Sequence, residues 1–209
     1  TSYTINSATI VFETPSKSHH HFQGWYEESS FTTLVETIPN GSTGSRTLFA
    51  SWQLEKHALS FHANGGTNSM QNQQVSYGGT TTLPENQFVR TGYHYIGWAT
   101  SAEGAVEYVD GDSLIMGDSD IILYAKWAAN ADTAYRVEHH RQDVSGAGYT
   151  LFETQSLTGT TAATVEATSK TYPGFVQNTG HANQKASGPV ASDGGLVLKL
   201  YYDRNTYTA

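Results

Sequence analysis

Three consecutive histidines, His19, His20 and His21, are the residues of this sequence best suited to holding a metal ion. In an extended segment His19 and His21 project to the same side, and two imidazoles make a partial site for zinc, nickel or copper. A closed zinc site needs about four ligands. The alternative is an exposed turn, whose copy later in the chain carries His94 at the third position. The sequence therefore predicts no metal site and no cofactor.

Carboxylates and hydroxyls are plentiful but lack the spacing that chemistry requires. Four aspartates with oxygen ligands suited to calcium do not follow the Asp-x-Asp-x-Asp-Gly pattern with a distal Glu, and their Ser and Gly neighbours fit ordinary turns; they are Asp110, Asp112, Asp118 and Asp120. No Gly-x-Ser-x-Gly elbow positions a nucleophile, and no spacing rule pairs two glutamates as acid and base. The sequence predicts no catalytic residues and a protein that is not an enzyme.

Aromatic side chains on strand faces offer a different chemistry. Tyr26, Phe31, Phe49 and Tyr124 cannot all lie in a core if their strands alternate between buried and exposed positions. Planar rings on a β-face can stack on sugars or pack on a partner protein. Alternatively, they bury against the neighbouring module. These four are the candidate residues for ligand or inter-module contact.

The segments that position these residues occur twice. The sequences FQGW (22–25) and LFASW (48–52) return as YIGW (95–98) and LYAKW (123–127). Trp25 and Trp98 lie 73 residues apart, and Trp52 and Trp127 lie 75 apart. One structural unit has been copied, and arrays of copied units usually hold or bind.

Composition narrows the class of protein. Aromatic residues make up 12% of the 209 residues and charged residues 14%, which is typical of an all-β surface protein. The net charge of −8, with only eleven Lys and Arg, argues against nucleic acid or an anionic membrane as partner. The absence of Cys excludes disulfides and thiolate chemistry. No apolar run of about 18 residues predicts membrane insertion.

Three modules are expected: residues 1–53, 54–127 and, after a polar linker at 128–133, 134–209. The four tryptophans should lie in module cores. The last strand should place one apolar face inward, formed by Leu196, Leu198, Leu200 and Tyr202. Asn64-Gly65 favours a tight hairpin turn with positive φ at both residues.

The second module resembles the Listeria-Bacteroides repeat, the family that includes the repeats of internalin B. The similarity rests on FHANGG (61–66), VSYGG (75–79), LP (83–84), RTGY (90–93), GW (97–98) and LYAKW (123–127). The first module resembles the same repeat without its opening strand. Residues 134–202, ending LKLYYD (198–203), are similar to mucin-binding-protein repeats. His19 stands where the second module has Gly92, so it must accept positive φ or form another turn.

The resemblance implies mainly β modules, each a small β-grasp (ubiquitin-like) fold, in an elongated array. It also implies secretion to the cell surface or cell wall of a Gram-positive or gut bacterium. The expected function is a non-catalytic stalk or spacer of an adhesin, with weak multivalent binding. A dedicated module for host glycans, mucin or surface proteins is the alternative, and an accessory region of a glycan-active enzyme is a remote one. Neighbouring repeats of the same chain are expected partners.

Overall fold

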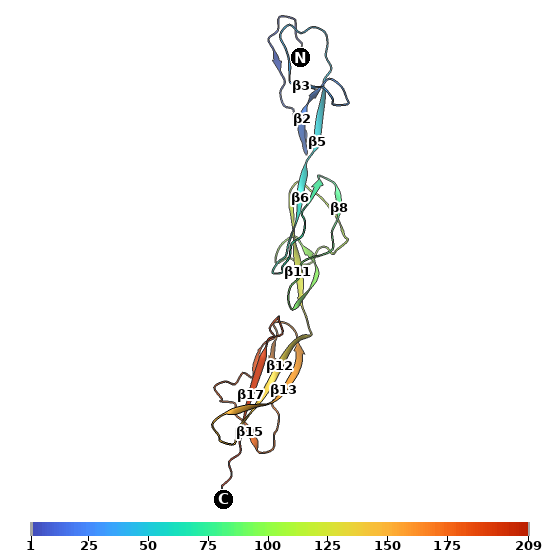
Figure 1. Cartoon of the computed structure of the whole chain (residues 1–209). Coiled ribbons are helices and arrows are strands. Elements are labelled where there is room, and N and C mark those ends of the chain that lie inside the picture. Colours follow the sequence, from blue (N-terminus) through green and yellow to red (C-terminus); the bar gives the residue numbers. More distant parts are fainter. Residues whose placement is uncertain (1, 209) are drawn as a thin grey trace. The chain divides into compact units, whose positions relative to one another are not determined.

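The computed structural model describes residues 2–208, and every regular element in this range is a β-strand (Figure 1). The mainly β fold class is therefore confirmed. Within the same range no helix is long and apolar enough to cross a membrane. The chain forms two compact units. Thr1–Ser60, Gln71–Pro84 and Gly111–Ile122 form one, and Phe61–Met70, Glu85–Asp110 and Leu123–Ala209 form the other.

The first repeat contains two small sheets. β2 lies at the centre of a sheet of order β3-β2-β5, and β1 pairs with β4. The strands are β1 (Ile10–Val11), β2 (His20–Tyr26), β3 (Leu34–Val35), β4 (Thr37–Ile38) and β5 (Phe49–Leu54).

The second repeat forms a four-stranded sheet of order β7-β6-β11-β9 and a β10-β8 pair. Its strands are β6 (Lys56–His62), β7 (Gln73–Ser76), β8 (Thr80–Thr82), β9 (Tyr93–Ala99), β10 (Ser113–Ile115) and β11 (Ile121–Ala129). Asn64 and Gly65 adopt the predicted positive φ, 48° and 89°. The return strand begins only at Gln73, so the connection is longer than the tight hairpin that the sequence favoured.

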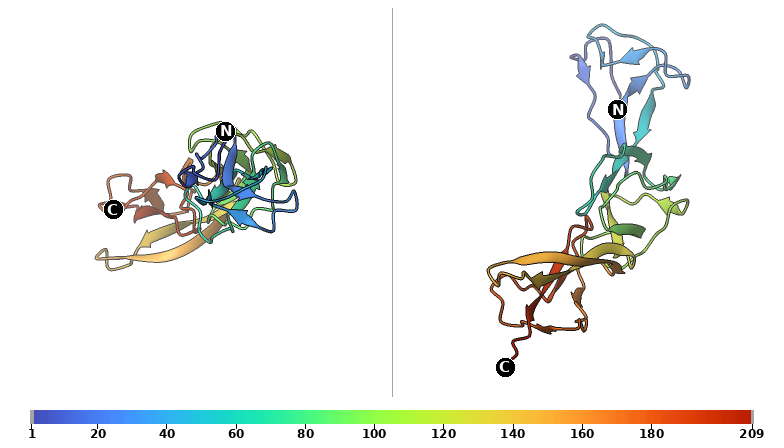
Figure 2. Two further views of the ribbon diagram at one scale, coloured as in Figure 1. Left: turned by 90° about the horizontal axis from the view of Figure 1, so that it is seen from above. Right: turned by 60° about the horizontal axis from the view of Figure 1, so that its bottom comes forward.

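The third module contains a four-stranded sheet of order β13-β12-β17-β15 and a β14-β16 pair. β12 and β13 form a long antiparallel hairpin, yellow to orange in Figure 2, while β12 and β17 run parallel. The strands are β12 (Thr133–Gln142), β13 (Tyr149–Gly159), β14 (Thr164–Glu166), β15 (Phe175–Gln177), β16 (Ser187–Pro189) and β17 (Val197–Arg204). A β-grasp sheet is crossed by a helix, and residues 2–208 contain none, so the β-grasp fold stays a prediction.

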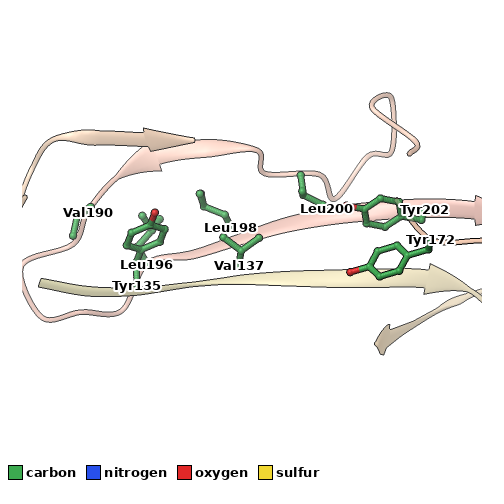
Figure 3. Packing of buried hydrophobic residues seen from close by; sticks show 8 residues of the cluster. All are labelled: Tyr135, Val137, Tyr172, Val190, Leu196, Leu198, Leu200 and Tyr202. Atoms are coloured by element: carbon green, nitrogen blue, oxygen red, sulfur yellow. The ribbon is translucent and has the colours of Figure 1, made fainter. Parts of the chain in front are cut away.

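The core of the third module confirms the predicted inward face of its last strand. Leu196, Leu198, Leu200 and Tyr202 are at most 5% exposed and pack with Val137 of β12 (Figure 3). These side chains alternate with Val197 and Lys199, which are only half-buried. The period-two pattern thus selects the buried face directly.

A β-bulge precedes the Gly-Trp pair in both repeats. Gln23 in β2 and Ile96 in β9 have no partner in the register of the neighbouring strand. The glycine that follows has φ of 142° in each case, and a Cβ there would lie 2.5 Å from Leu34 in the first repeat and from Val106 in the second. Only glycine fits this backbone and this space, so the bulge re-aims the tryptophan after it.

Candidate functional site

The predicted aromatic residues of the first repeat come together on one sheet face. Tyr26 is the cross-strand partner of Phe49 on β5 and of Leu34 on β3, so the three side chains share a face. The ring of Phe31 meets that of Tyr26 edge-on, with centroids 5.5 Å apart. Leu34, Phe31 and Phe49 are 51%, 45% and 38% exposed. We call these four residues the aromatic face.

A short loop holds Phe31 in this position. Phe31 has a positive φ of 55°, and its N–H donates to the carbonyl of Glu28. The Glu28 carboxylate accepts hydrogen bonds from the Thr33 N–H at 3.1 Å and the Thr32 hydroxyl at 3.0 Å. Hydrogen bonds from Thr33 and Thr32 lower the pKa of Glu28. The loop is therefore held by a charged acceptor, which fixes the exposed ring against Tyr26.

Tyr124, the fourth predicted residue, lies in the second repeat and is half-buried. Its ring lies 5.0 Å from that of His62, and its cross-strand partner is Ala99. Ala99 stands where the first repeat has Tyr26, so no aromatic row forms there. Leu34 was missed by the sequence reasoning. Its position next to Val35, after a turn, was the available signal.

One backbone residue connects the first repeat to the second. The N–H of Glu55 donates to the carbonyl of His19 at 2.9 Å, and the carbonyl of Glu55 accepts from the N–H of Tyr77 at 2.8 Å. The imidazole of His19 stacks on the ring of Tyr77, with centroids 3.6 Å apart and planes 5° apart. His19 takes the left-handed conformation, φ 56°, in place of a glycine. It serves as a contact between the two repeats.

The same arrangement recurs where the second repeat meets the third module. The N–H of Asn130 donates to the carbonyl of Gly92 at 2.9 Å, and the carbonyl of Asn130 accepts from the N–H of Thr161 at 2.9 Å. The side-chain oxygen of Asn130 lies 2.9 Å from Nδ1 of His94. Asn130 follows Glu55 by 75 residues, the spacing of Trp52 and Trp127. We call this pair of bonds the junction relay.

The segment 128–133 is not a wholly flexible linker. β11 continues to Ala129 and β12 begins at Thr133, so strands cover part of the segment 128–133 that the sequence favoured as a polar linker. Gly92 has φ 78°, and a Cβ there would lie 2.8 Å from Ser192. Side-chain patterns do not predict bonds between backbone groups, and the one available signal was a polar residue three positions after Trp52 and after Trp127.

Two adjacent histidines of the third module differ in burial. His139 is fully buried and His140 is half-buried. His139 lies 3.0 Å from the Tyr202 hydroxyl through Nδ1 and 3.0 Å from Gln155 Oε1 through Nε2. A register shift in the pairing of β12 with β13 falls between the two histidines, so strict alternation fails there. With both nitrogens engaged, His139 has a structural role.

One carboxylate, that of Glu153, lies next to this network. Glu153 accepts hydrogen bonds from the Tyr172 hydroxyl, at 2.8 Å, and from Lys170. The bonds from Lys170 and Tyr172 lower the pKa of Glu153, while burial and the bond to Glu153 raise the pKa of Tyr172.

Among residues 2–208, no group of three His, Asp or Glu is arranged to hold a metal ion.

Similarity to known proteins covers part of this chain. Two proteins of Evansella cellulosilytica are similar to this chain: one named "Putative membrane protein" is 33% identical over 123 residues, and one named "Putative Gly-rich membrane protein" is 28% identical over 121. Each match covers 57% of this chain, but only 17% and 13% of the respective relatives. The family model of the Listeria-Bacteroides repeat domain matches residues 1–51 and 57–126. It does not extend over the third module, whose similarity to mucin-binding-protein repeats stays a prediction. With more than half of its residues matched, the chain belongs to the Listeria-Bacteroides repeat family.

Proposed function

We propose that this chain is a non-catalytic repeat region of a bacterial cell-surface adhesin and acts chiefly as a stalk in or above the cell wall. Membership of the repeat family and the membrane names of the two relatives support a surface location. Binding to host glycans, mucin or surface proteins would be weak for one copy. It would gain strength when many copies act together, because linked modules raise the effective concentration.

The junction relay is the observation that carries the spacer role. A stalk must limit bending where modules meet, and a flexible polar linker does not. Here a single backbone residue bonds to a turn on each side, at both junctions and with the same spacing. These bonds are reinforced by the His19–Tyr77 stack at one junction and the His94–Asn130 contact at the other. We infer that the relay restricts the angle between successive modules.

The test removes the backbone N–H of Glu55 and leaves the length of the chain unchanged. Glu55→Pro deletes the N–H that bonds to His19, whereas Glu55→Ala keeps it and removes only the side chain. Because the chain contains no Cys, spin labels can be placed cleanly at Gln23→Cys and Asn72→Cys, both exposed. Electron paramagnetic resonance should give a narrow distance distribution for the parent and Glu55→Ala, and a broad one for Glu55→Pro. A broad distribution in the parent would refute the spacer role.

A dedicated binding module is the second candidate, and the aromatic face favours it. The ring contacts and cross-strand partners of Phe31 and Phe49 all lie within the first repeat, so these rings are available to a ligand. A glycan and mucin array probed with the parent and with a Phe31→Ser, Phe49→Ser variant tests this. Tight binding of one soluble copy, lost in the variant, would replace the spacer reading. Turnover of a glycan would instead favour an accessory region of an enzyme.

A further inference from the structure

The third module contains a pocket of about 200 Å³ where β12, β13, β15 and β17 approach one another. Arg141 and Arg204 both line it, together with Phe152, Phe175 and Thr150. We propose that this pocket is a subsite for an acidic sugar, one that carries a carboxylate or a sulfate ester. The inference goes beyond the spacer role and uses no residue of the junction relay.

Aromatic rings hold the two guanidinium groups in place. The guanidinium carbon of Arg141 lies 3.2 Å from the ring centroid of Phe152 and 4.8 Å from that of Phe175. The guanidinium carbon of Arg204 lies 5.1 Å from the same Phe175 ring, and its Nε donates to the Gln142 carbonyl at 3.1 Å. A guanidinium stacked on a ring keeps its N–H donors free at its edge, and that edge matches two oxygens of a carboxylate or sulfate.

Neither guanidinium has a carboxylate partner within 4.0 Å among the described residues. Arg46 and Arg136, by contrast, are paired with Glu27 and Glu138. Acidic residues outnumber Lys and Arg by nineteen to eleven in the whole chain, so two unpaired guanidiniums at one pocket are unexpected. Asp143 also lines the pocket, but its carboxylate accepts from the Thr150 hydroxyl at 2.5 Å. An external anion would supply the missing partner.

The size and walls of the pocket favour a sugar over an acidic peptide. A volume of about 200 Å³ is smaller than usual ligand pockets and accommodates one ring-sized group. Leu151 and Phe152 are each 48% exposed at its wall, next to the polar Thr150. A sugar ring presents C–H and hydroxyl groups to such a mixed wall and holds its acid group rigidly. An Asp or Glu side chain must lose rotamer freedom on binding.

The test uses nuclear magnetic resonance titration of the labelled full chain. Methyl glucuronide and glucose 6-sulfate should shift amides of Thr150, Phe175 and Arg204, while methyl glucoside at equal concentration should not. Added salt should weaken the binding, since the contact is between charges and Arg204 is exposed to solvent. The two acidic sugars distinguish a carboxylate ligand from a sulfate ester. Shifts from either one support the proposal.

Substitutions assign the effect to the pocket. Arg141→Gln combined with Arg204→Gln should weaken binding at least about tenfold. Arg46→Gln, which removes one arginine charge from the first repeat, should leave it unchanged. Should the double variant fail to fold, Arg204→Lys keeps the charge but loses the planar fork and should still weaken binding. Equal binding of free sulfate, of acetate or of an acidic tetrapeptide would overturn the proposal, as would binding that survives the double substitution.

Discussion

The two repeats build different cores around the same Gly-Trp motif. Trp98 is fully buried, contacts three aromatic rings and donates from Nε1 to Asp110 at 2.9 Å. Trp25 is half-buried, contacts Phe12 and Phe22, and its Nε1 is buried without a partner in the described structure. The motif sets the backbone, since both repeats share the bulge. What surrounds the indole decides how much the motif stabilises.

The largest expected difference comes from removing each indole. Trp98→Ala should lower the free energy of unfolding of the second repeat by roughly 3 to 5 kcal/mol. Trp25→Ala should cost the first repeat only about 1 to 2 kcal/mol, because less surface is buried there. Urea unfolding followed by amide signals from each repeat separates the two values. Equal losses would mean that the two cores are equivalent.

Removal of the carboxylate beneath Trp98 tests the acceptor directly. Asp110 accepts from the Tyr95 hydroxyl and from Trp98 at Oδ1, and from the Asn86 N–H at Oδ2. Asp110→Ala removes these three hydrogen bonds and should cost about 2 to 3 kcal/mol. Asp118→Ala, in an exposed turn, is the matched control and should change stability by less than about 0.5 kcal/mol. If Asp110→Ala left the free energy of unfolding unchanged, the hydrogen bond from Trp98 to Asp110 would not explain the stability of this core.

The junction glycine gives a smaller difference. Gly92→Ala adds a Cβ at positive φ, 2.8 Å from Ser192, and should cost about 1 to 3 kcal/mol. His19→Gly at the equivalent position should be near neutral, because relief of the left-handed backbone offsets the lost stack on Tyr77. Thermal unfolding of both variants checks this. If Gly92→Ala kept the parent's melting temperature while His19→Gly lowered it, the backbone conformation at these two positions would not explain the difference.

Acid should destabilise the third module more than the two repeats. This is the smallest of the four expected differences. Burial of Glu138 opposes ionisation, but Arg136, His140 and Lys199 together outweigh it and lower the pKa of Glu138. A lowered native pKa gives stability that is present above the unfolded value, about 4.3, and is lost as the pH falls through the native value. Protection factors for amide exchange, which correct for the slower intrinsic exchange in acid, should fall first in the third module between about pH 5 and pH 3. Glu138→Gln should reduce that dependence, and Glu153, whose pKa is also lowered, should carry the remainder.

Sequence patterns predicted the features that depend on one strand at a time. Alternation identified the buried face of β17, and the repeated Gly-Trp and Leu-to-Trp segments identified two copies of one unit. The pattern overstated the core at Trp25, Trp52 and Trp127, which are only half-buried, because burial depends on which distant rings surround each indole. The register shift beside His139 likewise depends on β13, which pairs with it.

The junctions and the candidate sites were less predictable. Tyr26, Phe31 and Phe49 were singled out from alternation alone, and their gathering on one face required the register of three strands. The relay is made by backbone groups, which every residue except proline carries. No side-chain pattern identifies such bonds. The pocket at Arg141 and Arg204 joins residues far apart in the chain.

The junction relay also has a consequence for how such a chain can change over generations. Glu55 and Asn130 each bond to the module before and the module after, so neither belongs to one module alone. An insertion or deletion of one residue beside them would shift the backbone N–H or carbonyl away from its partner in one of the two turns. A duplication or loss of the whole 75-residue period between them, however, restores both bonds. Unequal recombination would therefore lengthen or shorten the array in whole periods, while intermediate lengths would be removed by selection.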